Sequence, residues 1–574
     1  MPTAKVTKNV SAAEGGGNVL CSILISIKIK AWLYSFLPCG YNALKISFRF
    51  LPLKTDNFRR RFPVSCCPHT QNLAGLFILI VNFYYIGQQI KISAMKTNLL
   101  TIMLAAVLGM AIQVRAADGS LGVLPRLSAS ADGHFLQCSG GSPFFYLGDT
   151  AWELFHRLTR EEADAYLEDR AAKGFTVIQA VALAELDGLN TPNAYGHRPL
   201  KDNNPLEPDT REGENNDYWD HVDYIVRKAN SLGLYVGLLP TWGCHWNDGG
   251  AVFNRDNAAA YGRFIAARYK DCGVIWILGG DRNPDTPDKL AVIRAMAEGI
   301  RSVDKENLIT FHPTGWNGSS KWFHNDGWLS FNGRQNGHTP RYESYNNTLQ
   351  DYRLAPAKPV VDLEPLYEDH PIEFRPDQEG HSVSTHVRRA LYWDVFNGAC
   401  GVTYGHHSVW QMYDPDSKRG PVNRPLMTWR QALAQPGARQ AGYLRRLIES
   451  RPYFTRVPAP ELIIPAEVQS AVPGGNGRYR IVATMDRDGT YAMVYSPAGR
   501  AFSVRGDMLK AEKLKMWLFN PRTGKAEKVR TLRNDGKPIE LVPPAPGEAE
   551  DWVWVIDDAS KRYPAPGSRV YEED

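Results

Sequence analysis

Short apolar runs alternate with amphipathic segments from about residue 140 to residue 450 of the chain. An apolar run of four to eight residues between turn residues is typical of a strand that is buried on both faces. Eight runs fit this description, and we predict strands at 144–147, 176–182, 234–239, 274–278, 308–311, 328–331, 359–363 and 401–404.

The segments between these runs carry helix signatures. Thr159 is followed three residues later by Glu162, which is a capping box. A second helix is expected to begin at Asp217 and to end at Gly233, because the apolar residues between them recur at helical spacing. Further helices are predicted at 256–270, 287–303, 384–397 and 428–449.

Eight buried strands, most of them separated by helices, favour an α/β fold of the closed (β/α)8 type, a TIM barrel, over residues 122–451. An open, doubly wound sheet is the alternative. It would need a glycine-rich phosphate-binding turn after the first strand, and Leu147-Gly148-Asp149-Thr150 is not such a turn.

The pattern changes after about residue 452 to short alternating stretches at 478–484, 490–495, 514–519, 540–542 and 552–556. Turn sequences such as Asp488-Gly489 and Asn534-Asp535-Gly536 separate them. Residues 452–574 are therefore predicted to form a small C-terminal β-sandwich domain.

The composition is that of a globular protein, with 43% hydrophobic and 22% charged residues among 574. The net charge of +5 is unevenly spread, because residues 1–94 hold eleven lysines and arginines but two acids. That segment carries +9, so the remainder carries −4. We therefore expect no nucleic-acid partner.

Residues 95–116 have the order of a secretory signal peptide: Lys96, an apolar run at 99–112, and Val114-Arg115-Ala116 as a cleavage pattern. Since a signal peptide works near a true N-terminus, we interpret residues 1–94 as an upstream extension from a misassigned start. A membrane-anchoring leader is the alternative, but the apolar run at 73–86 is shorter than the roughly 20 residues that span a bilayer. The protein is expected to be exported, to the periplasm or beyond, without stable membrane insertion after cleavage.

The exported part lacks the sequence motifs of several classes of enzyme and metal site. Its four cysteines, Cys138, Cys244, Cys272 and Cys400, are too widely spaced for a disulfide framework or a metal knuckle. His-Glu-x-x-His, Gly-x-Ser-x-Gly and phosphate-loop motifs are absent. We therefore expect no metal and no cofactor.

The active site of a barrel of this kind is built from residues just past the carboxyl ends of the strands. Carboxylates, amides and histidines suit the hydroxyl groups of a sugar, whereas tryptophan faces suit its C–H surface. Five tryptophans fall in these loops: Trp152, Trp242, Trp246, Trp316 and Trp410. The residues expected to bind substrate are Asp149, Trp152, Glu185, Trp242, His245, Asn283, His312, Gln335, Tyr404 and Trp410.

Two carboxylates fit glycoside hydrolysis, which needs one acid to protonate the leaving oxygen and one carboxylate to attack or to activate water. Asp281 follows the fourth predicted strand and Glu364 the seventh. Gly279 and Gly280 leave space for a substrate beside Asp281. Asp362 lies two residues before Glu364, so both are expected to face the barrel axis, Asp362 as a buried support.

Three segments resemble the apiosidase-like glycoside hydrolases, glycoside hydrolase family 140. They begin at Phe144-Phe145-Tyr146-Leu147-Gly148-Asp149, at Trp276-Ile277-Leu278-Gly279-Gly280-Asp281 and at Asp362-Leu363-Glu364-Pro365. The C-terminal part is similar to the β domain that follows this barrel in the family, which is often labelled a collagen-binding domain. The resemblance covers roughly residues 122–560.

This resemblance implies an exo-acting enzyme that releases apiose from side chains of the pectin rhamnogalacturonan II. By position, Asp281 would be the general acid/base and Glu364 the nucleophile, with retention of configuration expected. A non-catalytic carbohydrate-binding protein on the same barrel, or a glycosidase with another sugar specificity, is the alternative. A collagenase-like peptidase ranks third, because it would need a metal triad or an activated nucleophile.

Overall fold

A computed structural model describes residues 124–339, 344–417, 419–464, 477 and 479–568. The predicted upstream extension (1–94) and signal peptide (95–116) lie outside these residues. No helix within the described ranges is long and apolar enough to cross a membrane.

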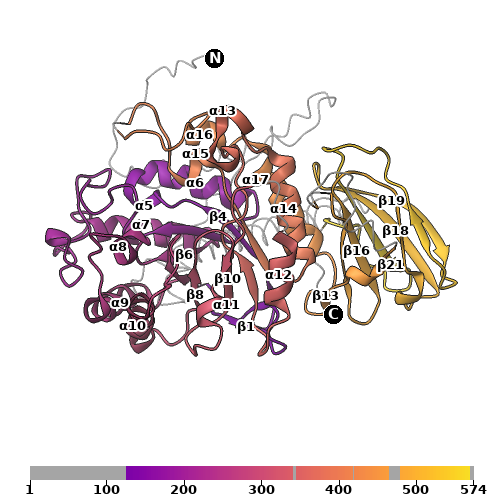
Figure 1. The fold of residues 1–574 in the computed structure, drawn as a ribbon, viewed down its shortest axis with the longest axis horizontal. Helices are drawn as coiled ribbons and strands as arrows, with labels where there is room; N and C mark the ends of the chain where they lie inside the picture. The colour runs from indigo at the N-terminus through magenta and orange to yellow at the C-terminus, as the bar shows by residue number, and fades with distance from the viewer. Residues whose placement is uncertain (1–123, 340–343, 418, 465–476, 478, 569–574) are drawn as a thin grey trace, which may run out of the picture. The chain divides into compact units, whose positions relative to one another are not determined.

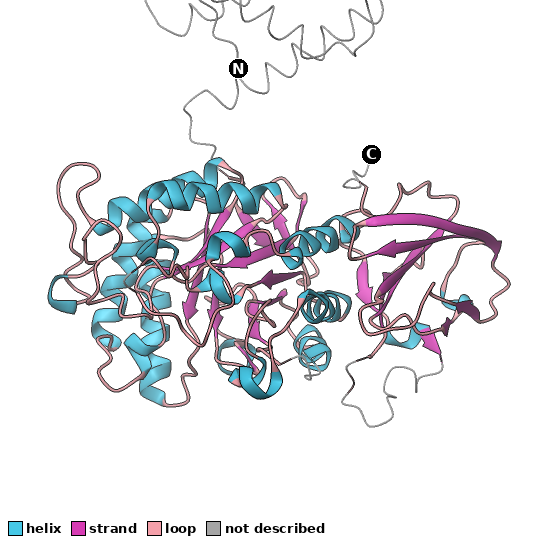
Figure 2. Ribbon diagram, turned by 90° about the horizontal axis from the view of Figure 1, so that it is seen from above, coloured by secondary structure: helices cyan, strands magenta, loops and turns pink. Residues whose placement is uncertain are grey.

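The eight central strands form a parallel sheet in the order β8-β7-β6-β5-β4-β12-β11-β10, surrounded by helices (Figure 1, Figure 2). The edges β8 and β10 approach each other, because the amide of Ser330 donates to the carbonyl of Ile309 (2.8 Å). The chain therefore folds as the predicted barrel. Its strands are β4 (Tyr146–Thr150), β5 (Val177–Val181), β6 (Tyr235–Leu239), β7 (Val274–Gly279), β8 (Ile309–His312), β10 (Asn332–Gln335), β11 (Val360–Asp362) and β12 (Gly401–Tyr404).

One strand lies wholly after the apolar run that predicted it. The run at 328–331 precedes β10, which consists of the polar residues Asn332-Gly333-Arg334-Gln335. All four are buried, and Arg334 pairs with Asp351 inside the protein. Hydrophobicity could not locate this strand, because buried polar groups with internal partners take the place of apolar side chains.

The long helices follow the predicted caps. Helix α6 (Arg160–Ala172) has the Thr159 capping box, and Asp217 caps α7 (Tyr218–Ser231). Next come α9 (Arg255–Tyr269), α10 (Pro287–Val303), α12 (Ser344–Tyr352) and α14 (Ser384–Phe396). The helix predicted at 428–449 is two helices, α16 (Trp429–Ala432) and α17 (Pro436–Ile448), because proline disfavours the helical conformation of the residue before it.

Shorter elements complete the barrel domain. Strands β1 (Leu127–Ala129), β2 (Leu136–Cys138) and β3 (Pro143–Phe144) form a separate antiparallel sheet, and β9 (Asn317–Gly318) pairs with β10. The short helices are α5 (Leu154–Arg157), α8 (Cys244–Asn247), α11 (Ser320–Phe323), α13 (Pro376–Glu379) and α15 (His407–Trp410).

The C-terminal part has two sheets, with strand orders β13-β15-β16-β21-β18-β19 and β14-β17-β20. A separate apolar cluster, including Val494, Phe502, Met516 and Leu541, draws residues from both sheets, as in a sandwich. The strands are β13 (Arg456–Pro458), β14 (Ile463–Ile464), β15 (Val482–Asp486), β16 (Tyr491–Ser496), β17 (Phe502–Val504), β18 (Lys513–Asn520), β19 (Lys525–Arg533), β20 (Ile539–Leu541) and β21 (Trp552–Asp558). Sequence reading missed β19, a largely exposed edge strand rich in lysine and arginine, because it has no apolar face.

The sandwich packs directly on the barrel, since the described residues of both parts belong to one compact unit. Tyr392 of α14 stacks on Tyr495 of β16 with ring centroids 4.5 Å apart. Arg388 of α14 makes a bidentate, buried ion pair with Asp551, at 2.7 and 2.9 Å. Contacts of this kind join the two parts through a common core rather than through a flexible linker.

Candidate active site

The turn that follows β7 brings Asp281 into the mouth of the barrel. Gly279, Gly280 and Asp281 all have positive φ (97°, 92° and 53°), a region in which glycine is free and aspartate is tolerated. A Cβ atom on Gly279 would lie 2.4 Å from the His312 carbonyl, and one on Gly280 would lie 2.8 Å from the Trp242 ring. The glycines therefore allow close packing of the turn, rather than leaving space for a substrate as we had expected.

The imidazole of His312 lies between the two predicted catalytic residues. Its Nδ1 atom accepts from the backbone amide of Asp281 (3.3 Å), and its Nε2 atom lies 3.0 Å from a carboxylate oxygen of Glu364. Asp281 and Glu364 thus come from strands β7 and β11 and lie on the two sides of one buried ring. This arrangement places both carboxyl groups at the same end of the barrel.

Glu364 is held as a carboxylate at the base of the site, where 7% of its side chain is exposed. Burial alone would raise its pKa, but contacts with His312 and His338 outweigh burial and lower the pKa to about 2. His338 Nε2 lies 2.8 Å from the other carboxylate oxygen. Sequence reading missed His338, which lies three residues past β10 and could have been found by reading further into that loop.

Asp281 has the opposite electrostatic environment. Desolvation in the site raises its pKa, and the negative charge of Glu364 raises it further, although 35% of the side chain remains exposed. Arg282 lowers the pKa of Asp281 without outweighing burial, because two of its guanidinium nitrogens bind Asp248 at 2.9 Å while the third lies 3.4 Å from Asp281 Oδ2. The site therefore pairs a carboxyl group whose pKa is raised with one whose pKa is lowered.

A third carboxyl group, Glu185, lies near both. Burial raises its pKa well above the ordinary value, with additional contributions from the charges of Glu153, Asp281 and Glu364. Its side chain is partly exposed and makes no hydrogen bond to any described residue. Glu153 fixes the loop beside it by accepting from the amide of Leu186 (3.3 Å).

Aromatic rings form one wall of the site. The rings of Trp152 and Trp242 have centroids 5.1 Å apart, and those centroids lie 5.5 and 6.0 Å from that of His312. Tyr367, which sequence reading did not assign, has a buried hydroxyl without a geometrically aligned hydrogen bond, and its pKa is raised well above the ordinary value by burial and then by the charge of Glu364. These groups surround two carboxyl groups whose pKa values are shifted in opposite directions.

The family model "Apiosidase-like, catalytic domain" matches residues 130–455, more than half of the chain. The chain belongs to this family. A second model, "Putative collagen-binding domain of a collagenase", matches residues 457–557 of this apiosidase-like protein.

Solved structures agree with this assignment. One named "Glycoside hydrolase" is 34% identical, with a TM-score of 0.69, and the match covers 77% of this chain and 98% of the other. A glycoside hydrolase family 5 protein from Bacteroides vulgatus ATCC 8482 is 32% identical, with a TM-score of 0.70 and coverage of 78% and 98%. No curated protein matches the chain. The apiosidase-like barrel is therefore that of a glycoside hydrolase.

Two residues predicted to bind substrate have structural positions instead. Asp149 is fully buried in β4, where Arg170 donates to it at 2.6 Å and Tyr166 also donates to it. Tyr404, paired with Asp149 in register, donates to Glu368 at 2.6 Å. Strand alternation turns both side chains toward the surrounding helices, so we correct both assignments to structural roles.

Other predicted substrate-binding residues also have internal partners. The side-chain oxygen of Asn283 accepts from the amide of Thr314 (3.1 Å). The indole of Trp410 is 9% exposed and donates to His407 (3.4 Å). His245 is half-buried and contacts the carbonyl of Ala184 (2.9 Å), next to Glu185. Gln335 is buried, and its side-chain oxygen lacks a partner among the described residues.

The remaining two loop tryptophans differ in burial, and the two histidines that follow β12 have internal partners. Trp246 is fully buried and donates to the carbonyl of Gly279 (2.9 Å), whereas Trp316 is 42% exposed. His406 lies 3.1 Å from Asp369, and His407 contacts main-chain carbonyls. In the described part of the chain, no three His, Cys, Asp or Glu side chains are grouped as metal ligands, and the four cysteines there are free.

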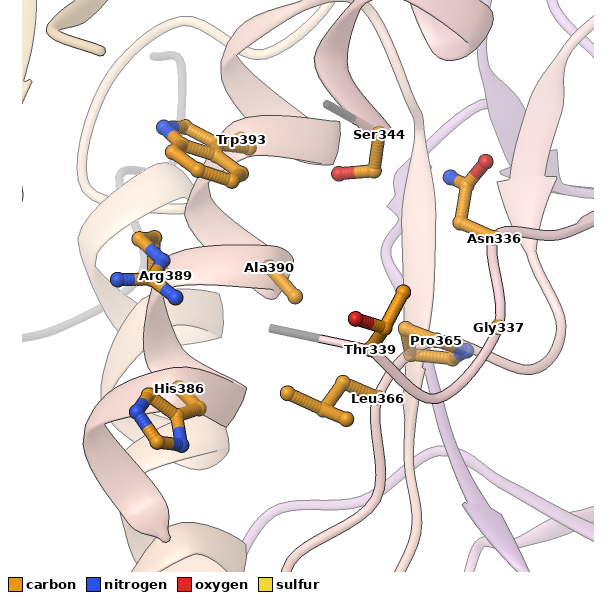
Figure 3. Close-up of a pocket in the computed structure, with 10 residues that line it drawn as sticks. All are labelled: Asn336, Gly337, Thr339, Ser344, Pro365, Leu366, His386, Arg389, Ala390 and Trp393. Atoms are coloured by element: carbon orange, nitrogen blue, oxygen red, sulfur yellow. The ribbon is translucent and has the colours of Figure 1, made fainter. Parts of the chain in front are cut away.

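A cavity lies next to the loop that carries Glu364, and it contains neither catalytic candidate. Pro365 and Leu366 line one side, Asn336 and Gly337 another, and Ala390 and Trp393 of α14 the opposite wall (Figure 3). The cavity therefore separates the Glu364 loop from helix α14.

Proposed function

We propose that this exported protein is an exo-acting, retaining glycosidase that releases terminal apiose from side chains of rhamnogalacturonan II, a plant cell-wall polysaccharide. The single observation that carries the proposal is the placement of Asp281 and Glu364 on opposite sides of His312, and the opposite shifts of their pKa values support it. Membership of the apiosidase-like family supports the choice of sugar.

In the first step, Asp281 gives its proton to the glycosidic oxygen as Glu364 attacks the anomeric carbon, so the aglycone leaves as an alcohol. The sugar is then bound to Glu364 as an ester. In the second step, Asp281, now a carboxylate, removes a proton from water, and the resulting hydroxide releases the sugar from Glu364. Both side chains return to their initial protonation states.

The remaining groups of the site would bind the sugar ring. The carboxyl of Glu185 can hydrogen-bond to its hydroxyls, whereas Trp152 and Trp242, which are 2% and 3% exposed, pack behind the site and hold its shape. The position of His245 beside Glu185 is compatible with a contact at the rim of the site.

Product analysis tests the proposal. Incubation with apiose-containing pectin oligosaccharides is expected to release free apiose, and NMR at early times should show the anomer with the configuration of the substrate. Release of a different monosaccharide would overturn the proposed sugar, but it would still support a glycoside hydrolase. A protein that binds these oligosaccharides without releasing any sugar would refute the catalytic proposal.

The pH profile of kcat/KM provides a second prediction, because it reports the acid and the base of the free enzyme. The lowered pKa of Glu364 keeps it ionised down to about pH 2, and the raised pKa of Asp281 keeps it protonated above its ordinary range. Replacing His338 by alanine removes one contact that lowers the pKa of Glu364. The acid limb should therefore move to higher pH, with the alkaline limb nearly unchanged.

His338→Gln is the matched control, because an amide can still donate to Glu364 but never carries a positive charge. Its acid limb is expected between those of the wild type and His338→Ala. An acid limb that is identical in all three proteins would show that His338 does not influence Glu364.

A further inference from the structure

A buried polar network lies behind the loop that carries Glu364. The side-chain amide of Asn336 donates to Asp362 Oδ2 (2.9 Å) and to Asp394 Oδ1 (3.1 Å). Thr348 of α12 also donates to Asp394 Oδ1 (2.7 Å). Asp362 ends β11 and Asp394 lies on α14, so this network joins the sheet to the helix; Figure 3 shows Asn336 across from α14. Asp362 therefore points toward α14, and not along the barrel axis as the sequence had suggested.

The network contacts the main chain of Glu364. Asp362 Oδ1 accepts from the amide of Glu364 (3.2 Å) and from that of Asn336 (3.3 Å). The amide of Gly337 in turn donates to the carbonyl of Glu364 (3.1 Å). The same segment, residues 336–338, also places the His338 side chain against the Glu364 carboxylate. The same hydrogen bonds thus position Glu364 and one of the histidines that hold it.

This cluster holds more carboxyl groups than positive charges, so a bound proton is needed to reduce its negative charge. Asp362 on β11 and Asp394 on α14 face Arg334 on β10, which is already bonded to Asp351 on α12. Other buried cations beside α14 have their own partners. Arg388 binds Asp551, and Arg456 donates to the carbonyls of Val395 and Ala399 (2.5 and 2.9 Å). Three buried carboxyl groups therefore share one guanidinium, and ionising all three would be costly.

Asp394 is the group that best holds the proton. Burial raises its pKa well above the ordinary value, and the charge of Asp362 raises it further. Its Oδ2 atom is buried and receives no hydrogen bond from the described residues, and the Asn336 amide bridges its Oδ1 atom to Asp362 Oδ2, so the two carboxyl groups are neighbours. A proton on Asp394 would therefore supply a donor to Asp362 while Oδ1 continues to accept from Asn336 and Thr348.

We propose that Asp394 is a positioning residue for Glu364, acting as a neutral carboxylic acid that donates to Asp362 and thereby fixes the backbone of Glu364. The proposal rests on the nucleophilic role of Glu364 proposed above. It also gives the C-terminal domain a part in the site. Tyr392 stacks on Tyr495, and Trp393 donates to the carbonyl of Arg480 (2.9 Å), so that domain holds the helix carrying Asp394.

Two substitutions of one residue test the proposal. Asp394→Asn replaces the acid with a neutral amide that can donate to Asp362 and accept from Thr348, so its kcat is expected to stay within about threefold of the wild type. Asp394→Ala removes the donor, and kcat should fall about tenfold or more with KM nearly unchanged, since small displacements of a reacting group are costly. Circular dichroism and the melting temperature show whether each variant folds.

The unfolding free energy as a function of pH provides an independent readout. A carboxyl group whose pKa is raised on folding stabilises the folded state at low pH, and this contribution is lost as pH rises from the ordinary pKa of aspartate through the folded one. The wild type should therefore lose stability relative to Asp394→Asn across that window. This measurement needs no folded Asp394→Ala protein.

Each result supports or overturns the proposal. Asp394→Asn as inactive as Asp394→Ala would show that an ionised Asp394 is required, and full activity of Asp394→Ala would show that the network does not position Glu364. Equal pH dependence of stability in the wild type and Asp394→Asn would also overturn it. If Glu364→Gln is inactive while Asp394→Ala is normal, this inference alone fails; an active Glu364→Gln would instead refute the proposed function.

Discussion

Replacing Glu364 by glutamine is expected to lower kcat by about a thousandfold or more while leaving the fold intact. Glutamine has nearly the same shape as glutamate, but it lacks the charge and the nucleophilicity that His312 and His338 maintain. The measurement is sugar release from the natural oligosaccharide together with circular dichroism. Glu527→Gln, at an exposed position of strand β19 in the C-terminal domain, is the matched control and should have wild-type activity.

Two substrates with different leaving groups distinguish the role of Asp281 from that of Glu364. An aryl glycoside with a good leaving group needs little protonation, so Asp281→Asn should lose much less activity in bond cleavage on that substrate than on the natural one. Glu364→Gln should lose activity on both. An equal loss for Asp281→Asn on the two substrates would remove the general-acid assignment, and an active Glu364→Gln would remove the nucleophile.

Replacing Asp551 by alanine is expected to destabilise the protein by about 3–5 kcal/mol, because it leaves the charge of Arg388 buried without its partner. Arg388 lies on barrel helix α14 and Asp551 lies next to β21, so the lost pair joins the two domains. Chemical denaturation followed by fluorescence would measure the change. Because the domains share a core, barrel and sandwich should unfold together in one earlier transition.

Asp507→Ala is the control for this experiment. Asp507 pairs with Arg505 at 2.6 Å on the surface of the same domain, where both side chains are about half exposed. Water replaces such a partner easily, so we expect no measurable change in the unfolding transition. The prediction fails if Asp551→Ala unfolds like the wild type, or if the sandwich alone unfolds early while the barrel remains folded.

The apolar pattern predicted most of the architecture correctly. Buried strands such as β5, β6 and β7 consist almost entirely of apolar residues, and caps such as Thr159 and Asp217 act through local hydrogen bonds. Local rules therefore suffice for these elements. Strand β10 was misplaced because its buried polar residues are satisfied by partners distant in sequence, such as Asp351 for Arg334.

The candidate site also contains residues that the sequence could identify and residues that it could not. The sequence identified Asp281 and Glu364 because each follows a strand of the repeating pattern, and the resemblance to the apiosidase-like family rests on those same segments. The sequence could not distinguish Asp149 from these two residues. An acid at a strand end gives the same sequence pattern whether its side chain faces the site or, as for Asp149, pairs with Arg170. The missing information was the direction of each side chain.

The sequence by itself determined the barrel, the appended sandwich and the two carboxyl groups that end strands four and seven. Only the tertiary structure decided which groups surround those carboxyls: His338 from one loop, Glu185 from another, and Asp394 from a helix behind the site. The physical reason is that strand and helix periodicity depend on neighbouring residues, whereas the charge state of an acid depends on every group packed around it.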